Sequence, residues 1–207
     1  MKKNIILMLI LVAGCNLLHA QKSSNSKSKA SANRYFIDVH YMEPGNLKIE
    51  DVAEAHKKDL QTQGKYGVNF IRYWVDEKNG VIYCLSSATD SNAVKQTHAE
   101  AHGLRPALVY EVTSGEETPD IKPENLFLDI HYLGEGKVSA ADVAEAHTKD
   151  LAVEGKNGVR FINYWVDVNK GVVFCLSQAA NGEAVSQTHE EAHGLVPATV
   201  VSVKQGN

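Results

Sequence analysis

The sequence predicts an α+β protein made of two copies of one unit with the element order βαββαβ. Residues 36–112 and 127–203 align at a constant offset of 91 positions, with 44 identities in 77 positions and no gap. Within each unit, the hydrophobic pattern alternates between the periods of strands and helices. Because 43% of the 207 residues are hydrophobic, the chain can bury one core or two small ones.

The first unit begins with a strand and a helix. Residues 36–41 are a short run of β-branched and aromatic residues, which predicts a strand. Residues 49–61 place Val52, His56 and Leu60 at positions i, i+4 and i+8. This spacing predicts an amphipathic helix whose apolar stripe contains a histidine.

The remaining elements of the unit follow at short intervals. Residues 69–76 predict a second strand, the Lys-Asn-Gly sequence at 78–80 predicts a hairpin turn, and residues 81–86 predict the third strand. Residues 91–102 predict a second helix, which the glycine that follows ends at a typical C-cap position. Residues 108–112 predict the fourth strand.

This order is the ferredoxin-like plan, in which two helices cover one face of a four-stranded antiparallel sheet. The other face is apolar and needs a partner, which the second copy supplies. We therefore expect ferredoxin-like repeats at 34–113 and 126–204, packed as a pseudo-twofold α+β barrel pair, with side-by-side domains as the alternative. Residues 114–125, rich in Glu and Pro, predict an exposed linker.

The first 20 residues predict a signal for export rather than part of the fold. Two lysines precede an apolar run at 5–12, which is too short to span a bilayer and typical of a secretory signal. The Val-Ala-Gly-Cys sequence at 12–15 resembles a bacterial lipobox, in which Cys15 would be lipidated. Cleavage after Ala20 is the alternative. The protein is therefore expected to be exported, either as a membrane-anchored lipoprotein or as a periplasmic protein.

Charge separates the leader from the body. Residues 21–33 are rich in Ser, Lys and Asn, which predicts a flexible tether. All 25 acidic residues lie after position 33, whereas five of the 21 cations lie before it. Residues 34–207 thus carry 16 cations and a formal net charge of about −9, which argues against binding to nucleic acid.

Eight of the nine histidines lie at matched positions of the two repeats. His98 and His102 share a helical stripe with Val94, and two histidines four residues apart can hold one metal ion. If the topology is ferredoxin-like, His40 lies near His102, and His56 points inward from the neighbouring helix. The predicted metal-binding residues are His40, His56, His98, His102, His131, His147, His189 and His193.

Each of these residues also has a purely structural interpretation. A buried histidine such as His56 can donate to a backbone carbonyl, whereas two rings on one stripe are costly to bury with nothing between them. Asp38 shares a strand face with His40, where it can orient an imidazole or lie solvated at an edge. Cys84 and Cys175 are matched, and they can be soft ligands or plain buried thiols.

Several segments together resemble a known family. They are the Phe-Ile-Asp-Val-His-Tyr run at 36–41, residues 53–60, residues 71–76 and the His-Ala-Glu-Ala-His-Gly-Leu ending at 98–104. They resemble small bacterial domains whose named examples are called nickel-binding proteins, with a ferredoxin-like or dimeric α+β barrel fold. The resemblance implies binding of divalent nickel by a dimer-like assembly. The duplication and the export signal depart from the usual single-domain form.

Three functions follow from these observations. The first is an exported protein that binds a divalent ion in each repeat, with nickel implied by the resemblance and copper or zinc equally suited to imidazole. The second is a small α+β barrel enzyme of the oxygenase or isomerase type, in which histidines act as acid or base. The third is a lipid-anchored interaction module with structural histidines.

Overall fold

The computed structural model describes residues 34–115, 122 and 124–207. The expected signal and tether at 1–33 and most of the expected linker lie outside these residues. None of the helices in the described part of the chain combines the length and apolarity needed to cross a bilayer. Repeat 1 contains β1 (Arg34–Tyr41), α1 (Ile49–Tyr66), β2 (Asn69–Asp76), β3 (Val81–Ala88), α2 (Ser91–Ala101) and β4 (Leu108–Ser114).

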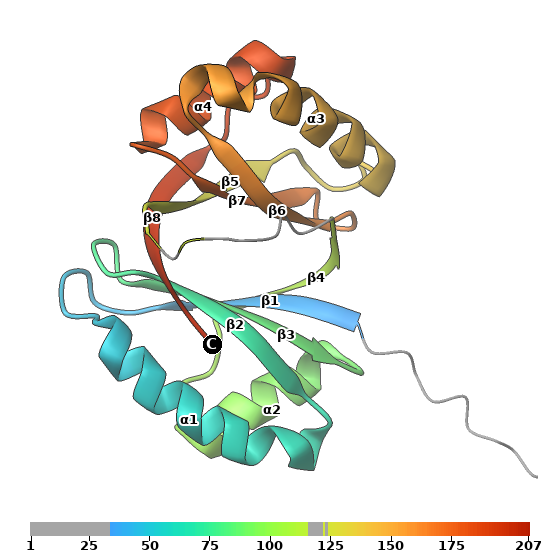
Figure 1. Ribbon diagram of the computed structural model, residues 1–207. Coiled ribbons are helices and arrows are strands. Elements are labelled where there is room, and N and C mark those ends of the chain that lie inside the picture. The colour runs from blue at the N-terminus through green and yellow to red at the C-terminus, as the bar shows by residue number, and fades with distance from the viewer. Residues whose placement is uncertain (1–33, 116–121, 123) are drawn as a thin grey trace, which may run out of the picture. The chain divides into compact units, whose positions relative to one another are not determined.

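Repeat 2 has the same order of strands and helices. It contains β5 (Leu126–Tyr132), α3 (Ala140–Val153), the 3-10 turn η1 (Glu154–Asn157), β6 (Arg160–Asp167), β7 (Val172–Gln178), α4 (Gly182–His193) and β8 (Thr199–Gly206). The βαββαβ prediction is therefore confirmed for both units. Figure 1 shows each pair of helices on the outer face of its own sheet.

The eight strands close into one barrel in the order β1-β3-β2-β8-β5-β7-β6-β4. Within each repeat the strands follow the ferredoxin-like order, and the last strand of each repeat continues along the other sheet. β8 pairs with β2 from Tyr73–Gly206 to Val75–Lys204, and β4 pairs with β6 at Thr113–Val166 and Ser114–Trp165. Because β4 and β8 each pair with a strand of both sheets, the barrel is one covalently linked pseudo-dimer, as the duplication predicts.

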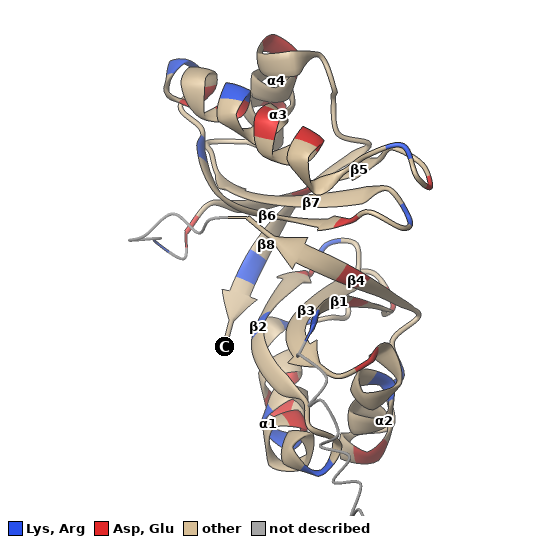
Figure 2. Ribbon diagram, turned by 90° about the vertical axis from the view of Figure 1, so that its right-hand side faces the viewer, with Lys and Arg blue, Asp and Glu red and all other residues tan. Residues whose placement is uncertain are grey.

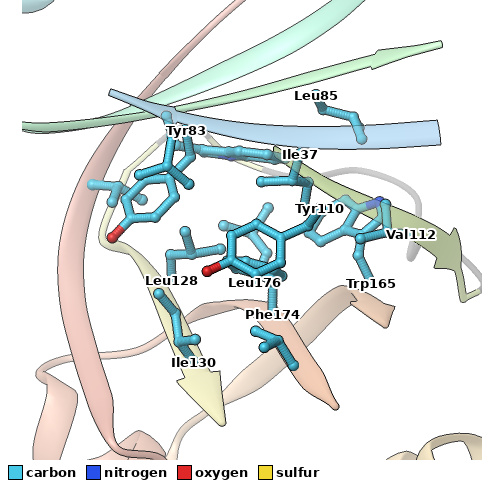
Figure 3. Packing of buried hydrophobic residues seen from close by; sticks show 14 of the residues in the cluster. Ile37, Tyr83, Leu85, Tyr110, Val112, Leu128, Ile130, Trp165, Phe174 and Leu176 are labelled. Atoms are coloured by element: carbon cyan, nitrogen blue, oxygen red, sulfur yellow. The ribbon is translucent and has the colours of Figure 1, made fainter. Parts of the chain in front are cut away.

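The inside of the barrel is a packed apolar core. Strand alternation directs Ile37 and Val39 inward from β1, and Trp74 and Trp165 meet from the two sheets with ring centroids 5.0 Å apart. Figure 3 shows aromatic and aliphatic side chains of both repeats interdigitating between the sheets. The tryptophans are core residues, and the barrel interior is filled by side chains rather than hollow.

A β-bulge in the second strand of each repeat sets which side chains face the helices. The register shifts between Phe70 and Arg72, and again between Phe161 and Asn163. As a result Phe70 and Tyr73, three residues apart, both face the helix layer, while Trp74 faces the barrel core. Simple alternation along an unbroken strand would not place them so.

The first helix differs from its prediction in length and in its buried stripe. α1 continues to Tyr66, beyond the end predicted at position 61, and Gly67 ends it with φ of 65°. Leu60 is 41% exposed, whereas Asp59 is 3% exposed. The buried stripe therefore runs through positions i, i+4 and i+7, and it carries a carboxylate toward the sheet.

Helices α1, α2 and α3 carry both acidic and basic side chains, whereas α4 carries three glutamates and no Lys or Arg (Figure 2). The ion pairs at the surface are local or bridge neighbouring elements, such as Lys204–Glu77 at 2.8 Å between β8 and the turn after β2. This distribution agrees with the charge argument against a nucleic-acid partner.

Replacing Trp165 by alanine should destabilise the whole barrel, because it removes a side chain packed against both sheets and leaves a cavity. We expect the free energy of unfolding to fall by about 3–5 kcal/mol in chemical denaturation. Trp165→Phe, which keeps an aromatic ring at this position, should lose clearly less. Equal effects of the two substitutions would contradict a packed interior.

Candidate metal centre

Strand alternation places polar side chains between sheet and helices in each repeat. On β1, Asp38 and His40 point to the side opposite Ile37 and Val39. Cys84 of β3 lies directly across from Asp38 in the antiparallel register. Asp38 is fully buried and His40 is 5% exposed, so Asp38 is not a solvated edge residue.

The second helix brings two imidazoles over this polar face. The Asp90 side chain caps the start of α2 by accepting from the backbone N–H groups of Asn92 and Ala93, and His102 lies at its C-cap. Because His98 and His102 are one helical turn apart, both rings face the sheet and α1, with centroids 5.3 Å apart. The ring of His40 lies 6.5 Å from that of His102, so these segments converge as the topology predicted.

Three ligand atoms meet at one point between α1 and α2. His98 Nδ1 lies 3.0 Å from Asp59 Oδ1 and 3.2 Å from His102 Nε2, and His102 Nε2 lies 3.2 Å from Asp59 Oδ1. Ligands bound at about 2.0–2.1 Å to one ion are separated by about 2.9–3.4 Å in octahedral or tetrahedral geometry. The three atoms, which we call the outer triad, therefore have the mutual separations that a single divalent ion requires.

Repeat 2 reproduces the outer triad. His189 Nδ1 lies 3.0 Å from Asp150 Oδ1 and 3.3 Å from His193 Nε2, which in turn lies 3.2 Å from Asp150 Oδ1. The side chains that approach one another are the same residue types at the same offset of 91 positions. The arrangement is thus a property of the repeated sequence and not of one local packing accident.

The central imidazole of each repeat is held between two carboxylates. His98 donates from Nδ1 to Asp59 and from Nε2 to Asp38, at 3.0 Å and 3.3–3.4 Å. Burial by itself lowers the His98 pKa, but the charge of Asp38 and the bonds to both carboxylates raise it to about 10. His189 has a pKa of about 9, because the nearby carboxylates of Asp129 and Asp150 likewise outweigh burial. In the absence of metal, these rings hold a proton on each nitrogen at neutral pH.

His56 and His147 lie beside the triad rather than in it. The His56 ring packs against Tyr73 and Phe70, with centroids 4.9 and 6.0 Å away. Burial, partly opposed by Asp59, lowers the pKa of His56. His147 packs in the same way against Tyr164 and Phe161, and burial lowers its pKa too. Among the described residues, neither His56 nor His147 belongs to a group of three or more His, Cys, Asp or Glu side chains whose ligand atoms lie within 4.8 Å of one another.

A small apolar cavity adjoins the triad, and it is larger in repeat 2. It measures about 70 Å³ beside His189 and His193, with walls that include Val143, Tyr164 and Val173. The counterpart in repeat 1 measures about 30 Å³. Ile82 of repeat 1 stands where repeat 2 has Val173, so the loss of one methylene group contributes to the difference.

The sequence analysis missed the carboxylates of the triad, Asp59 and Asp150. A signal for them was present, because both aspartates are matched in the two repeats and follow a predicted inward histidine by three residues. Position i+7 of the stripe that begins at Val52 is as close to the buried face as position i+8. The apolar Leu60 was taken as the third stripe residue in its place.

The nickel responsive protein SCO4226-like family model matches residues 36–112 and 127–203, which are the two repeats. This chain belongs to that family. No curated protein shows significant sequence similarity to the chain. The structure of SCO4226 from Streptomyces coelicolor A3(2) is 34% identical, with a TM-score of 0.35, and the match covers 37% of this chain and 93% of SCO4226. One SCO4226 chain thus corresponds to one repeat, and this family member is a tandem form.

Two other solved structures are similar over both repeats. A mutant chlorite dismutase from Candidatus Nitrospira defluvii is 8% identical, with a TM-score of 0.49, and the match covers 86% of this chain and 92% of the enzyme. An anthrone oxidase-like protein is 7% identical, with a TM-score of 0.47, and the match covers 84% and 90% of the two chains. Identities this low carry no information about the chemistry of this chain.

The metal-free protein should keep doubly protonated rings at mildly alkaline pH. In nitrogen-15 NMR spectra of histidine-labelled, chelator-treated protein at pH 8, we expect N–H signals from both nitrogens of His98 and His189. His56, whose pKa is lowered, should be neutral in the same spectrum and serves as the internal control. Neutral rings at His98 and His189 would contradict the conclusion that two carboxylates raise the pKa of each ring.

The same protons link stability to pH. A group whose pKa is raised by folding stabilises the protein fully below its unfolded value of about 6.5, and this contribution is lost as pH rises toward the folded value. Between pH 7 and 8, the free energy of unfolding of the metal-free protein should fall by roughly 2–3 kcal/mol for the two rings together. Urea denaturation at the two pH values measures this loss, and a flat profile would speak against it.

Proposed function

We propose that this protein binds a divalent metal ion, nickel or one of similar ligand preference, in each repeat. The ligands are His98, His102 and Asp59 in repeat 1, and His189, His193 and Asp150 in repeat 2. One observation carries the proposal: in both repeats, two imidazole nitrogens and one carboxylate oxygen lie mutually 3.0–3.3 Å apart. Membership of a family described as nickel responsive supports it.

The donor set fits nickel but does not by itself select it. Two imidazoles and one carboxylate suit Ni²⁺, Zn²⁺, Cu²⁺ and Fe²⁺, and the intrinsic order of affinities favours Cu²⁺ over Ni²⁺. The preference for nickel therefore rests on the family, and copper and zinc are the competing ions to test.

The residues around the triad prepare it for an ion. When Nδ1 of His98 ligates, its Nε2–H still donates to Asp38, which fixes the orientation of the ring and makes the nitrogen a better donor. In the absence of metal, the backbone N–H of Leu104 donates to His102 Nδ1 at 3.2 Å, which keeps the ring proton on Nε2. Ligation through Nε2 moves this proton to Nδ1, and the exposed Leu104 segment can turn its N–H to water.

Export remains part of the proposal and rests on the sequence alone. The apolar run at 5–12 and the lipobox-like sequence ending at Cys15 support a membrane-anchored lipoprotein outside the cytoplasm, and cleavage after Ala20 would give a periplasmic protein. Fractionation of cells that express the full chain, with Cys15→Ser as the comparison, separates the two. Recovery of both proteins from the cytoplasm would overturn export.

The cavity of repeat 2 favours a second candidate function. Three protein ligands leave coordination positions open, as in metal enzymes, and the cavity of about 70 Å³ beside His189 can admit a small apolar group. An enzyme of the small α+β barrel class would use this site rather than the filled barrel interior. Turnover that is lost with Asp150→Ala but kept with Asp59→Ala would support it.

Metal binding should depend on the triad carboxylates. Chain purified without a histidine tag should bind nickel in titration calorimetry, and Asp59→Ala with Asp150→Ala should weaken binding at least about 100-fold, since a ligand matters more than the outer partners that cost 10–100-fold. Glu54→Ala with Glu145→Ala removes exposed carboxylates from the same helices and is the matched control. No binding by the natural chain would leave the interaction module as the better function.

Binding should also weaken in acid. A protonated imidazole cannot coordinate, so nickel affinity should fall as pH drops below about 6, and metal should be released there. Dialysis of nickel-loaded protein at pH 7.5 and pH 5, followed by elemental analysis, measures the release. Retention of the full metal content at pH 5 would exclude imidazole as the main ligand.

A further inference from the structure

We infer that each repeat holds a second, inner metal ion that shares the central imidazole with the outer ion. The inner ligands are Asp129, His131, Cys175 and His189 in repeat 2, and Asp38, His40, Cys84 and His98 in repeat 1. The inference deepens the proposed metal binding and rests on it. The ion it calls for is a divalent ion of borderline softness, such as Zn²⁺ or Co²⁺, because the donors are sulfur, nitrogen and oxygen.

The geometry of the inner group is already close to that of a site. In each repeat, one ligand atom from each of the four residues lies within 4.8 Å of all the others. His131 Nε2 and His189 Nε2 lie 3.2 and 3.4 Å from Asp129 Oδ1. A sulfur ligand at about 2.3 Å needs separations of about 3.5 Å from its neighbours, so the thiolate has to approach by about 1.3 Å at most.

A further observation in repeat 2 concerns the hydrogen bonds of Asp129. Within the described residues, neither carboxylate oxygen of Asp129 makes a hydrogen bond, and neither does His189 Nε2, although all three atoms are buried. The nearby imidazole nitrogens are close enough but not aligned to donate. The charge of Asp129 is balanced by the His189 imidazolium 3.4 Å away, but its oxygens lack aligned donors, and buried polar groups in proteins are normally hydrogen-bonded or bind metal. An ion among these four side chains gives these oxygens a partner.

The shared imidazole joins the inner group to the outer triad. His98 Nδ1 belongs to the outer triad and its Nε2 faces Asp38 and His40, and His189 is placed identically. With both ions present, the ring is an imidazolate, Asp38 changes from hydrogen-bond acceptor to ligand, and the ions lie roughly 6 Å apart. Relative to the metal-free protein, both ring protons of the shared imidazole and the thiol proton leave to solvent.

Charge balance also favours two ions. Asp38, Asp59, the Cys84 thiolate and the imidazolate together carry four negative charges, which match two divalent cations. Because Asp38, Asp59, His98 and Cys84 are at most 7% exposed, a cluster without net charge is the form that such a buried site tolerates best. The free, buried thiols of Cys84 and Cys175 thereby gain a role as the soft ligands that the sequence left open.

Reconstitution of the chelator-treated, untagged chain with Co²⁺ tests the inference. We expect about four cobalt ions per chain and a sulfur-to-cobalt charge-transfer band in the near ultraviolet. Cys84→Ser with Cys175→Ser should abolish the band and leave about two ions per chain in the outer triads. Asp59→Ala with Asp150→Ala should keep the band and also bind about two ions. His98→Ala with His189→Ala should lose both ions of each repeat, because the imidazole is shared.

The possible results separate this inference from the proposed function. About two ions per natural chain and no sulfur band would overturn the inner ion while leaving the outer triads intact. Absence of any bound cobalt or nickel would overturn both. The spectrum of the natural chain needs no variant, so the test holds even where a substitution in the buried layer prevents folding.

Discussion

One face of each four-stranded sheet is apolar and is not covered by the sheet's own two helices, which lie on the opposite face. The hydrophobic effect therefore requires a second sheet, and the duplicated chain supplies it. β4 and β8 extend along the opposite sheet and close the barrel by backbone hydrogen bonds. Everything else in the structure is arranged around this closed interface, which buries Trp74 and Trp165 at its centre.

A filled barrel leaves the layers between sheets and helices as the place for chemistry. There the strands present Asp38, His40 and Cys84, and the helices present His98, His102 and Asp59. Burial makes this placement expensive for charged groups unless each has a partner of opposite charge. In the absence of metal, the imidazole of His98 between two carboxylates provides that partner, and its raised pKa expresses the same coupling.

The polar layers connect stability with binding. A protonated imidazole and a divalent cation are alternative ways to balance the same carboxylates, so metal has to displace protons to enter. The two repeats carry the same ligands, but their adjoining cavities differ in volume, about 70 Å³ against about 30 Å³. Duplication has thus given one chain two equivalent sets of metal ligands. A small molecule has more room beside the set in repeat 2 than beside the set in repeat 1.

The sequence alone determined the duplication and the order of elements, because an internal repeat and hydrophobic periodicity can be read along the chain. It also determined the convergence of His40, His98 and His102, because the ferredoxin-like order of elements brings these segments together. It left barrel or side-by-side packing open, and it missed Asp59, since positions i+7 and i+8 lie on opposite flanks of the helical stripe and docking of the helix decides which flank is buried. The bulge between Phe70 and Arg72, after which Tyr73 faces His56 and Trp74 faces the core, was also not predicted from the sequence of this strand. Only the packed structure decided these points, because the rotation of a helix and the register of a strand are set by what lies across from them.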